Sequence, residues 1–320
     1  MQLNGKKILI TGATGFIGAN LIRHLIKNYE CQIYIFIRET SNLWRINDII
    51  NSEKIKIYYC DIRNKEEVYF ILREIKPDIV YHLATYGMFL NREKDKESII
   101  ATNINALFYL IEASKEVGVK RFINTGTTSE YGIKNKPMRE DMKLDPVNTY
   151  GATKASGTIL ATQLAQEYNF NLITLRLFSP YGYYEDKDRL FPYLILKFLD
   201  NEPIKLSNKN SVRDFTFIED IINGYIQATL IDNIKNGEVI NIGNGNQKRI
   251  IDIVQILEKI KGDSLDIEWG KISPKQEEPV KWEANNKKAR KILKWKPYFT
   301  LEKGIKKLID WFKENKRLYY

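Results

Sequence analysis

The first half of the chain alternates short apolar runs with longer segments in which apolar residues recur every three or four positions. Runs rich in Ile, Val, Tyr and Phe predict strands, and the longer period predicts amphipathic helices. We therefore expect strands at 8–10, 32–37, 55–59, 79–83, 121–124 and 172–177, and helices at 68–74, 99–117 and 150–168. This alternation is typical of an α/β fold with a doubly wound parallel sheet.

Three glycines follow the first predicted strand and lead into a helix. Gly12, Gly15 and Gly18 are spaced as G-x-x-G-x-x-G. A turn without Cβ atoms lets backbone N–H groups approach a pyrophosphate, which also benefits from the positive end of the helix dipole. The pattern predicts a dinucleotide site in a Rossmann-type fold, although similar glycines also form ordinary turns.

The pattern changes after Phe178, where aromatic residues, prolines and turn residues gather. We expect residues 1–178 to form the dinucleotide-binding domain, to which segments near 210–245 return. Residues 179–320 should form mainly a smaller α/β domain that binds the substrate. Open α/β sheets bind ligands at the carboxyl ends of their strands, so this domain should lie over that edge.

The end of the second predicted strand bears on the choice of cofactor. An acid there binds the adenosine ribose 2′-hydroxyl, whereas an arginine can neutralise a 2′-phosphate. Arg38 stands at this point, with Ser41, Asn42 and Arg45 close behind, which favours NADP over NAD. Glu39 is one position further along, so NAD stays open.

Composition and charge exclude several classes of protein. The 320 residues contain no apolar run of the ~20 residues that a membrane span needs. The chain enters a strand almost at once, and Cys31 and Cys60 form neither a disulfide framework nor a metal-site spacing. We therefore expect a cytoplasmic protein with no membrane partner and no metal.

The net charge of +10 is concentrated near the C-terminus. Residues 287–320 hold ten lysines, two arginines and three acidic residues, a net charge of +9. Their helix-like spacing around apolar residues indicates a solvated helix face. A nucleic-acid site would call for more arginine and for clustered aromatic residues, so we expect no nucleic-acid partner.

Tyr150 and Lys154 are four residues apart in a predicted helix, so their side chains share a face. A nearby cation lowers the pKa of a tyrosine and makes its oxygen a usable proton carrier. The hydroxyl-rich turn at 126–132 follows a predicted strand and could hold a substrate oxygen against the phenol.

With these features, the chain resembles the extended short-chain dehydrogenase/reductases that modify nucleotide sugars, over essentially its whole length. The matching motifs occur in the family's order: Thr11-Gly12-x-x-Gly15-Phe16-Ile17-Gly18, Asp61-Ile62, His82-Leu83-Ala84, Asn103, the hydroxyl-rich turn, Tyr150-x-x-x-Lys154, Leu175-Arg176-Leu177-Phe178-Ser179-Pro180-Tyr181-Gly182, Arg213-Asp214-Phe215 and Leu293-Lys294-Trp295-Lys296-Pro297.

The resemblance implies roles for individual residues. Tyr150 would be the acid/base, Lys154 would hold the nicotinamide ribose and depress the pKa of Tyr150, and Thr127 takes the place of the family's catalytic Ser/Thr. Further cofactor contacts would come from Thr14, Phe16, Ile17, Asp61, Ile62, Leu83, Ala84 and Asn103. The substrate contacts expected are Tyr86, Thr128, Ser179, Arg189 and Arg213, the last on the diphosphate. For His82, a structural role in fixing the backbone is favoured over a catalytic one.

Departures from the family pattern narrow the reaction. The family's 4,6-dehydratases carry an acid two residues after the catalytic threonine, but here that residue is Ser129, and Glu130 lies one place too late. No Cys/His pair is placed for epimerisation at C3 and C5. Ser179 stands where many relatives have an asparagine, so one phosphate contact of the family is open here.

Hydride chemistry at C4 of a nucleotide-diphosphate sugar is what remains. Arg38 favours a 4-ketoreductase or 4-dehydrogenase that uses NADP. The alternative is an NAD-dependent 4-epimerase, a 4,6-dehydratase is less favoured, and a non-catalytic dinucleotide-binding protein is the rival class. The family usually forms homodimers through two long helices, which would be 99–117 and 150–168 here.

Overall fold

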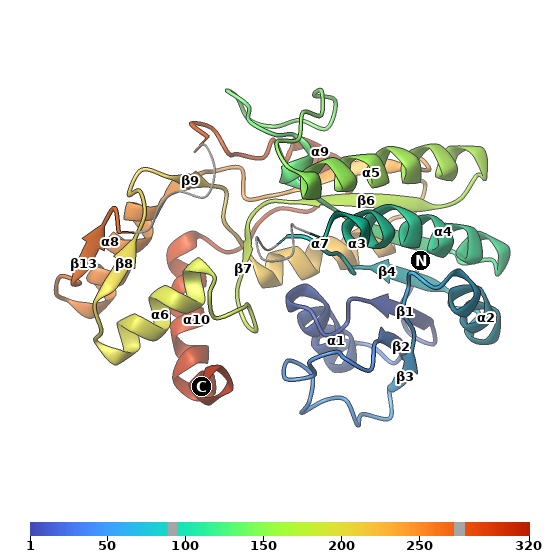
Figure 1. Cartoon of the computed structure of the whole chain (residues 1–320), viewed down its shortest axis with the longest axis horizontal. Coiled ribbons are helices and arrows are strands. Elements are labelled where there is room, and N and C mark those ends of the chain that lie inside the picture. The colour runs from blue at the N-terminus through green and yellow to red at the C-terminus, as the bar shows by residue number, and fades with distance from the viewer. Residues whose placement is uncertain (89–94, 272–278) are drawn as a thin grey trace.

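The computed structural model describes residues 1–88, 95–271 and 279–320, and its centre is a seven-stranded parallel sheet (Figure 1). The strand order is β11-β6-β5-β4-β1-β2-β3. The bounds are β1 Lys7–Thr11, β2 Gln32–Ile37, β3 Ile55–Tyr59, β4 Ile79–His82, β5 Arg121–Thr127, β6 Leu172–Leu177 and β11 Glu238–Ile242. The predicted Rossmann-type α/β fold is confirmed.

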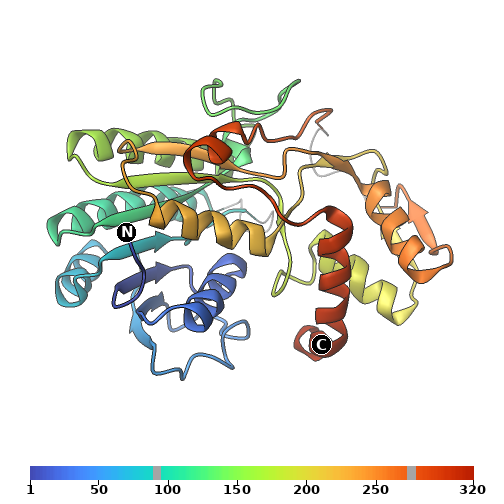
Figure 2. The ribbon, with the colours of Figure 1, turned by 180° about the vertical axis from the view of Figure 1, so that it is seen from behind.

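Helices cover both faces of this sheet because each presents one apolar side. Helices α1 (Phe16–Asn28) and α7 (Ile218–Leu230) pack on one face. Helices α2 (Lys65–Ile75), α4 (Ala106–Glu116) and α5 (Thr149–Glu167) pack on the other. Figure 2 shows α7 across the face opposite α4 and α5. The core strands are buried along nearly their whole length, as strands covered on both faces must be.

The helix predicted at 99–117 contains a local irregularity. Helix α3 (Lys96–Ile100) passes through a π-helical turn, Ala101–Asn105, into α4. Asn103 lies in this turn and is 1% exposed. Single π-helical turns inside α-helices are frequent at functional sites.

The rest of the chain builds a smaller region beside the sheet, at the left of Figure 1. Its helices are α6 (Leu190–Asp200), α8 (Ile250–Lys261) and α10 (Leu301–Asn315), whereas α9 (Lys287–Ile292) lies against β11 of the large sheet. Two-stranded ladders join β7 (Pro180–Tyr181) to β10 (Thr216–Phe217), β9 (Val212–Arg213) to β12 (Lys248–Arg249), and β8 (Ile204–Leu206) to β13 (Ile267–Trp269). Between these segments the chain returns to the large sheet through α7 and β11. The division into two functional domains stays a prediction.

The basic C-terminal segment is amphipathic, as its spacing predicts. Helix α10 buries Ile305, Leu308 and Phe312, while its lysines face outward. None of the helices within the described residues is long and apolar enough to cross a bilayer.

Candidate active site

The glycine turn between β1 and α1 is shaped by close backbone contacts. Gly12 has φ +71°, and a Cβ atom there would lie 2.6 Å from the backbone nitrogen of Ala84. A Cβ atom on Gly18 would lie 2.3 Å from the carbonyl oxygen of Gly12. Neither position tolerates a side chain, so the first turn of α1 stands close to the carboxyl ends of β1 and β4.

This turn fits the pyrophosphate of a dinucleotide. Gly15 is the N-cap of α1 and supplies no capping side chain, and the first turn of the helix contains no acid. The first N–H groups of a helix have no partner within it, so those of Phe16, Ile17 and Gly18 are available to an anion. The backbone at Thr14, Leu83 and Ala84 borders the same turn.

His82 connects β4 to β1 in this region. Its Nδ1 lies 2.8 Å from the Thr11 hydroxyl oxygen, which also accepts a hydrogen bond from the Ala84 N–H at 3.3 Å. Burial, followed by the charge of Lys154, lowers the pKa of His82 to about 3. The imidazole is therefore neutral and structural, which agrees with the role predicted for it.

The residues after β2 divide into an exposed and a buried set. Arg38 is exposed, and its backbone N–H donates to the Ser41 hydroxyl at 2.9 Å, while the Asn42 side chain accepts from the Trp44 N–H at 3.1 Å. Arg45, in contrast, is only 8% exposed.

The Arg45 guanidinium is committed to the protein. It donates to the carbonyls of Tyr184 at 2.7 Å and Thr14 at 3.4 Å, and it forms an ion pair with Asp186 at 3.0 Å. The predicted contact of Arg45 with the cofactor stays a prediction. Arg45 joins the glycine turn to the segment that follows β7.

Asp61, predicted to lie at the adenine, is likewise engaged. Its carboxylate accepts two hydrogen bonds from Arg63 Nε and one from Arg63 Nη2, at 2.6–3.1 Å, and the Arg63 contact lowers the pKa of Asp61. The neighbouring Ile62 side chain is buried against α2 residues. Their contact with the adenine stays a prediction.

Tyr150, Lys154 and Thr127 come together where β5 and α5 meet. Thr127 ends β5 and caps a 3-10 turn, Thr128–Glu130. Tyr150 and Lys154 lie in α5 and are 8% and 5% exposed. The side chains of Thr85 and Thr127 form hydrogen bonds with the Tyr150 phenol. The predicted trio is therefore assembled at one place.

The direction of the Tyr150 pKa differs from the expectation. Burial raises the pKa of Tyr150 to about 12, against the opposing effect of the Thr85 and Thr127 hydrogen bonds. Burial also lowers the pKa of Lys154 to about 8, against the opposing charge of Glu130. Helical spacing correctly predicts that the two side chains are neighbours. The prediction of a lowered Tyr150 pKa was wrong, because burial disfavours both the charged phenolate of Tyr150 and the charged ammonium of Lys154.

Asn103 fixes the loop after β4 to α5. Its amide nitrogen donates to the Tyr86 carbonyl at 2.9 Å and to the Thr153 hydroxyl at 3.0 Å. Its oxygen accepts from the Tyr86 N–H at 3.0 Å and from the Thr85 hydroxyl at 3.1 Å. These bonds hold Thr85 beside Tyr150, so Asn103 supports the site through the protein; its predicted contact with the cofactor is untested.

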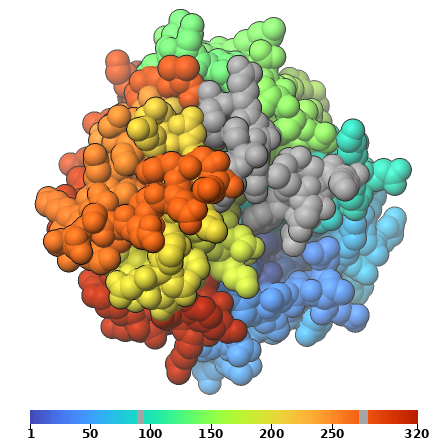
Figure 3. All heavy atoms as spheres, turned by 60° about the vertical axis from the view of Figure 1, so that its left-hand side comes forward, coloured from blue at the N-terminus to red at the C-terminus, as the bar shows by residue number. Residues whose placement is uncertain are grey.

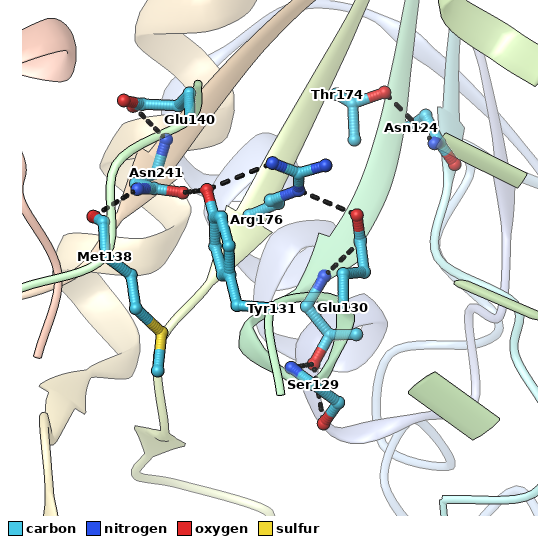
Figure 4. Close-up of polar contacts among 10 residues, drawn as sticks. Asn124, Ser129, Glu130, Tyr131, Met138, Glu140, Thr174, Arg176 and Asn241 are labelled. Atoms are coloured by element: carbon cyan, nitrogen blue, oxygen red, sulfur yellow. Dashed lines mark hydrogen bonds and ion pairs between the residues drawn. The ribbon is translucent and has the colours of Figure 1, made fainter. Parts of the chain in front are cut away.

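A buried polar network lies behind Thr127 (Figure 4). The Glu130 carboxylate accepts from the Thr127 N–H at 2.8 Å and from Arg176 Nε at 2.7 Å. Arg176 also donates to the Tyr131 hydroxyl at 3.0 Å, and that hydroxyl donates to the Asn241 side chain at 2.7 Å. Asn241, in β11, extends the network: its backbone N–H donates to the Glu140 carboxylate and its side-chain amide donates to the Met138 carbonyl.

The predicted substrate residues come from several segments that are far apart in the sequence. Thr128 is 5% exposed, and Ser179 has φ +29° at the junction of β6 and β7. The charge of Arg189 acts on Tyr150, and Arg213 lies 5.4 Å from the Trp282 ring centroid. Tyr86 is held by Asn103. Figure 3 shows a depression between the blue N-terminal atoms and the yellow atoms of the smaller region. The substrate roles stay predictions.

Sequence analysis missed two features of the site. Thr85, which bonds to Tyr150, directly follows the His82-Leu83-Ala84 motif and was the next hydroxyl in the chain. Arg176 is a charge inside an otherwise apolar strand, which signals a buried acidic partner. The Thr127-x-x-Glu130 spacing is that of a capping box and could have identified the partner.

Comparisons with known proteins agree with this geometry. The profile of the NAD-dependent epimerase/dehydratase family matches residues 8–243. The chain is 30% identical to UDP-glucuronate 4-epimerase of Thermodesulfobacterium geofontis, over 96% of both chains. It is 28% identical to dTDP-glucose 4,6-dehydratase of Salmonella typhimurium, over 97% of this chain and 93% of that one.

A solved structure gives the same picture. UDP-glucuronic acid 4-epimerase from Bacillus cereus, in complex with UDP-glucuronic acid and NAD, has 32% sequence identity and a TM-score of 0.85. The match covers 97% of this chain and 99% of that one. The resemblance stated from the motifs is confirmed. The chain therefore belongs to the NAD-dependent epimerase/dehydratase family, as an enzyme of the extended short-chain dehydrogenase/reductase class.

Proposed function

We propose that this protein is an NAD-dependent 4-epimerase of a UDP-linked sugar. The observation that carries the proposal is the contact of the Tyr150 phenol with the Thr85 and Thr127 side chains, at a site where the nearest acid, Glu130, is withdrawn from the reacting face. Among the described residues, this arrangement can move a proton at a sugar hydroxyl but offers no second acid for removing water.

Tyr150 would carry the proton of the C4 hydroxyl. When bound, the nicotinamide ring would accept and return the C4 hydride, and its positive charge in the oxidised form would favour the phenolate. The contacts of Thr85 and Thr127 with the phenol oppose the effect of burial on the Tyr150 pKa. Lys154 would hold the ribose through its ammonium, and the buried setting would keep water away from the reacting atoms.

Epimerisation is favoured over dehydration by the position of Glu130. Loss of water from C6 needs an acid that reaches the sugar, as well as a carrier at C4. Glu130 is fully buried, with one oxygen on the Thr127 N–H and the other on Arg176. Ser129, two residues after Thr127, offers only a hydroxyl. The dehydratases among the relatives therefore provide a weaker precedent than the epimerases.

NAD is favoured over NADP mainly by the precedent of a similar epimerase solved with NAD. Arg45 is committed to Tyr184, Thr14 and Asp186, which leaves Arg38 as the remaining arginine at this strand end. The Bacillus cereus epimerase was solved with NAD. The expectation of a 4-ketoreductase depended on NADP that exchanges at each turnover, so the 4-epimerase alternative now has more support.

The experiment uses protein purified without added cofactor. Incubation with UDP-glucose and with UDP-glucuronic acid should invert C4 of one of them, followed by ¹H NMR of the anomeric and H4 signals. Cofactor released by denaturation should be NAD by mass spectrometry. Tyr150→Phe should lower kcat by roughly 10²–10⁴-fold, because it removes the proton carrier but leaves the ring.

The matched control is Tyr168→Phe, at the C-terminal end of the same helix. It should retain wild-type activity. Turnover only after addition of a 4-keto sugar and NADPH would support the 4-ketoreductase instead. Equal rates for wild type and Tyr150→Phe would remove the catalytic proposal.

We also infer a homodimer formed through the helical face of α4 and α5. Apolar side chains stay exposed on this side of the molecule, with Ile100 at 45% and Ile159 at 60%. Light scattering coupled to size-exclusion chromatography measures the mass directly.

A further inference from the structure

Residues 183–186, the strap, follow β7 and lie beside α1 (Figure 1). Two buried side chains, each 8% exposed, hold the backbone of the strap. Asn20 Nδ2, in α1, donates to the Tyr183 carbonyl at 2.8 Å. Arg45 Nε, in the segment after β2, donates to the Tyr184 carbonyl at 2.7 Å. The partners are 163 and 139 residues apart, so these bonds join distant parts of the chain.

The same two side chains also bind the glycine turn. Asn20 Nδ2 donates to the Phe16 carbonyl at 2.8 Å, and Arg45 Nη1 donates to the Thr14 carbonyl at 3.4 Å. Thr14 and Phe16 stand on either side of Gly15, the N-cap of α1. The turn that fits a pyrophosphate is therefore connected to the strap on both sides of this residue.

The strap has a strained backbone that its neighbours hold in place. Tyr184 has φ +63°, a left-handed conformation that bulky residues rarely adopt. Residues of this kind persist only where the surrounding structure fixes them, and they cluster at ligand clamps and switch regions. The Arg23 guanidinium carbon lies 4.3 Å from the Tyr184 ring centroid, and the Trp311 ring centroid lies 4.9 Å from it. Arg45 adds an ion pair with Asp186 at 3.0 Å.

A restrained cofactor turn suits the chemistry of a 4-epimerase. Such an enzyme returns the C4 hydride to the sugar from which it came, so the cofactor is unchanged after each turnover and has no need to leave. A 4-ketoreductase, in contrast, must exchange its oxidised cofactor each time. The Thr14 and Phe16 carbonyls belong to the turn from which a pyrophosphate would have to leave, so a strap fastened to them opposes that departure.

We propose that Asn20 and Arg45 are positioning residues of the cofactor site: they fasten the strap to the glycine turn and thereby slow the release of NAD. The inference rests on the proposed function, in which NAD takes up the C4 hydride and returns it without leaving the protein. It assigns to the strap a role in cofactor retention, in addition to its place between β7 and α6.

The first test compares Asn20→Ala with Asn28→Ala in the full-length protein. Asn28 is a matched control in the same helix, because its amide donates to the His24 carbonyl, four residues earlier, at 2.8 Å. Asn20 makes the equivalent bond to Phe16. Among the described residues, only Asn20 of this pair also bonds to the strap.

The second test compares Arg45→Met with Arg121→Met. Arg121 is a matched control because it is also buried and donates to two carbonyls, those of Ala228 at 3.1 Å and Ile231 at 2.5 Å. It begins β5, at the edge of the sheet opposite to the glycine turn. Arg121→Met therefore reports what the loss of a buried arginine does to the fold as a whole.

Release is measured on protein loaded with ¹⁴C-labelled NAD, mixed with an excess of unlabelled NAD and filtered at intervals, with no sugar present. Asn20→Ala and Arg45→Met should each release the label roughly 3–10-fold faster, because each loses hydrogen bonds to the strap. Hydrogen exchange of the backbone amides in residues 182–189, followed by mass spectrometry, should also become faster. Both controls should keep the wild-type release rate, even where Arg121→Met lowers the thermal midpoint.

Wild-type release rates from folded Asn20→Ala and Arg45→Met would overturn the proposal, as would rapid release from the wild type itself. Faster release from Arg45→Met alone, with unchanged exchange in the strap, would also overturn it, because Arg45 would then act by touching the cofactor. If Arg45→Met does not fold, Asp186→Asn removes the ion pair from the side of the strap.

The outcomes also separate this proposal from the proposed function. Slow, strap-dependent release of NAD from a protein that inverts no sugar at C4 would contradict only the 4-epimerase. An active 4-epimerase whose variants release NAD as slowly as the wild type would contradict only the role of the strap.

Discussion

Glu130, in the turn after β5, and Glu185, in the segment after β7, are both buried carboxylates, but their surroundings differ. Glu130 has the Arg176 guanidinium at 2.7 Å and a backbone N–H at 2.8 Å. Glu185 is 6% exposed, and Arg189 Nε lies 3.7 Å from its nearer oxygen. Within the described part of the chain, its other oxygen has no hydrogen-bond partner.

Glu185 shows what burial does to a carboxyl that has no close counter-ion. Burial raises the pKa of Glu185 from its usual 4.5 to about 8, although Arg189 and Arg45 oppose the shift. At neutral pH this carboxyl is therefore largely protonated. Glu130, which is buried as deeply, forms an ion pair with the Arg176 guanidinium on an adjacent strand.

The largest effect should come from breaking the Glu130 pair. Arg176→Met leaves a carboxylate buried without its counter-ion, which should cost about 3–5 kcal/mol of unfolding free energy. The neutral pair Glu130→Gln/Arg176→Met should recover much of this loss. Chemical denaturation of the two single variants and the double variant measures the coupling.

Arg73→Met is the control for losing an arginine ion pair. Arg73 contacts Glu116 on the surface, with both side chains well exposed, so its loss should change stability little. Equal losses for Arg176→Met and Arg73→Met would show that the buried pair has no special weight.

A smaller effect is expected from Glu185→Gln, and its sign depends on pH. Between pH 4.5 and about 8 the folded protein holds a proton on Glu185 that the unfolded chain has released. The contribution of this residue to stability therefore falls as pH rises through that window and is constant above it. Glu185→Gln should abolish this fall in stability with pH. It should raise the free energy of unfolding by roughly 2–4 kcal/mol at pH 8–9 and leave it unchanged near pH 4.

Thermal and denaturant unfolding from pH 4 to pH 9 checks this prediction. Glu53→Gln, at an exposed position, is the matched control and should leave the pH dependence unchanged. A wild-type and a Glu185→Gln curve that run parallel across this range would mean that Glu185 is charged in the folded protein.

The sequence predicted what depends on local pattern. Strands at 32–37, 55–59 and 172–177 match the observed bounds, because apolar β-branched runs are specified locally. The glycine turn and the proximity of Tyr150 to Lys154 could also be predicted, since each lies within a single turn or helix. The π-helical turn at Asn103 was not, because it depends on contacts with Tyr86 and Thr153, which lie 17 and 50 residues away.

The electrostatics of the site depend on contacts that the sequence separates widely. Arg45 was predicted to contact the cofactor from its place after the second strand, but its guanidinium donates to the carbonyl of Tyr184, 139 residues further along the chain. Arg176 is 46 residues from Glu130. The pKa of Tyr150 follows burial, which is a property of the packed site rather than of helical spacing. Charge states were therefore the least predictable part of the site.

The smallest effect should come from crowding Glu130 without touching a charge. In Gly126→Ala the new methyl group would lie 2.6 Å from a Glu130 oxygen and 3.0 Å from Arg176 Cγ. We expect a loss of about 1–3 kcal/mol of unfolding free energy, typical of an overpacked core, and a lower kcat because the Thr127 backbone shifts. The same substitution in a Glu130→Ala background should cost less, since the space is then free. Equal losses of unfolding free energy in both backgrounds would show that Gly126 is needed for its own backbone conformation. Glu130 would then be held less tightly than its contacts imply.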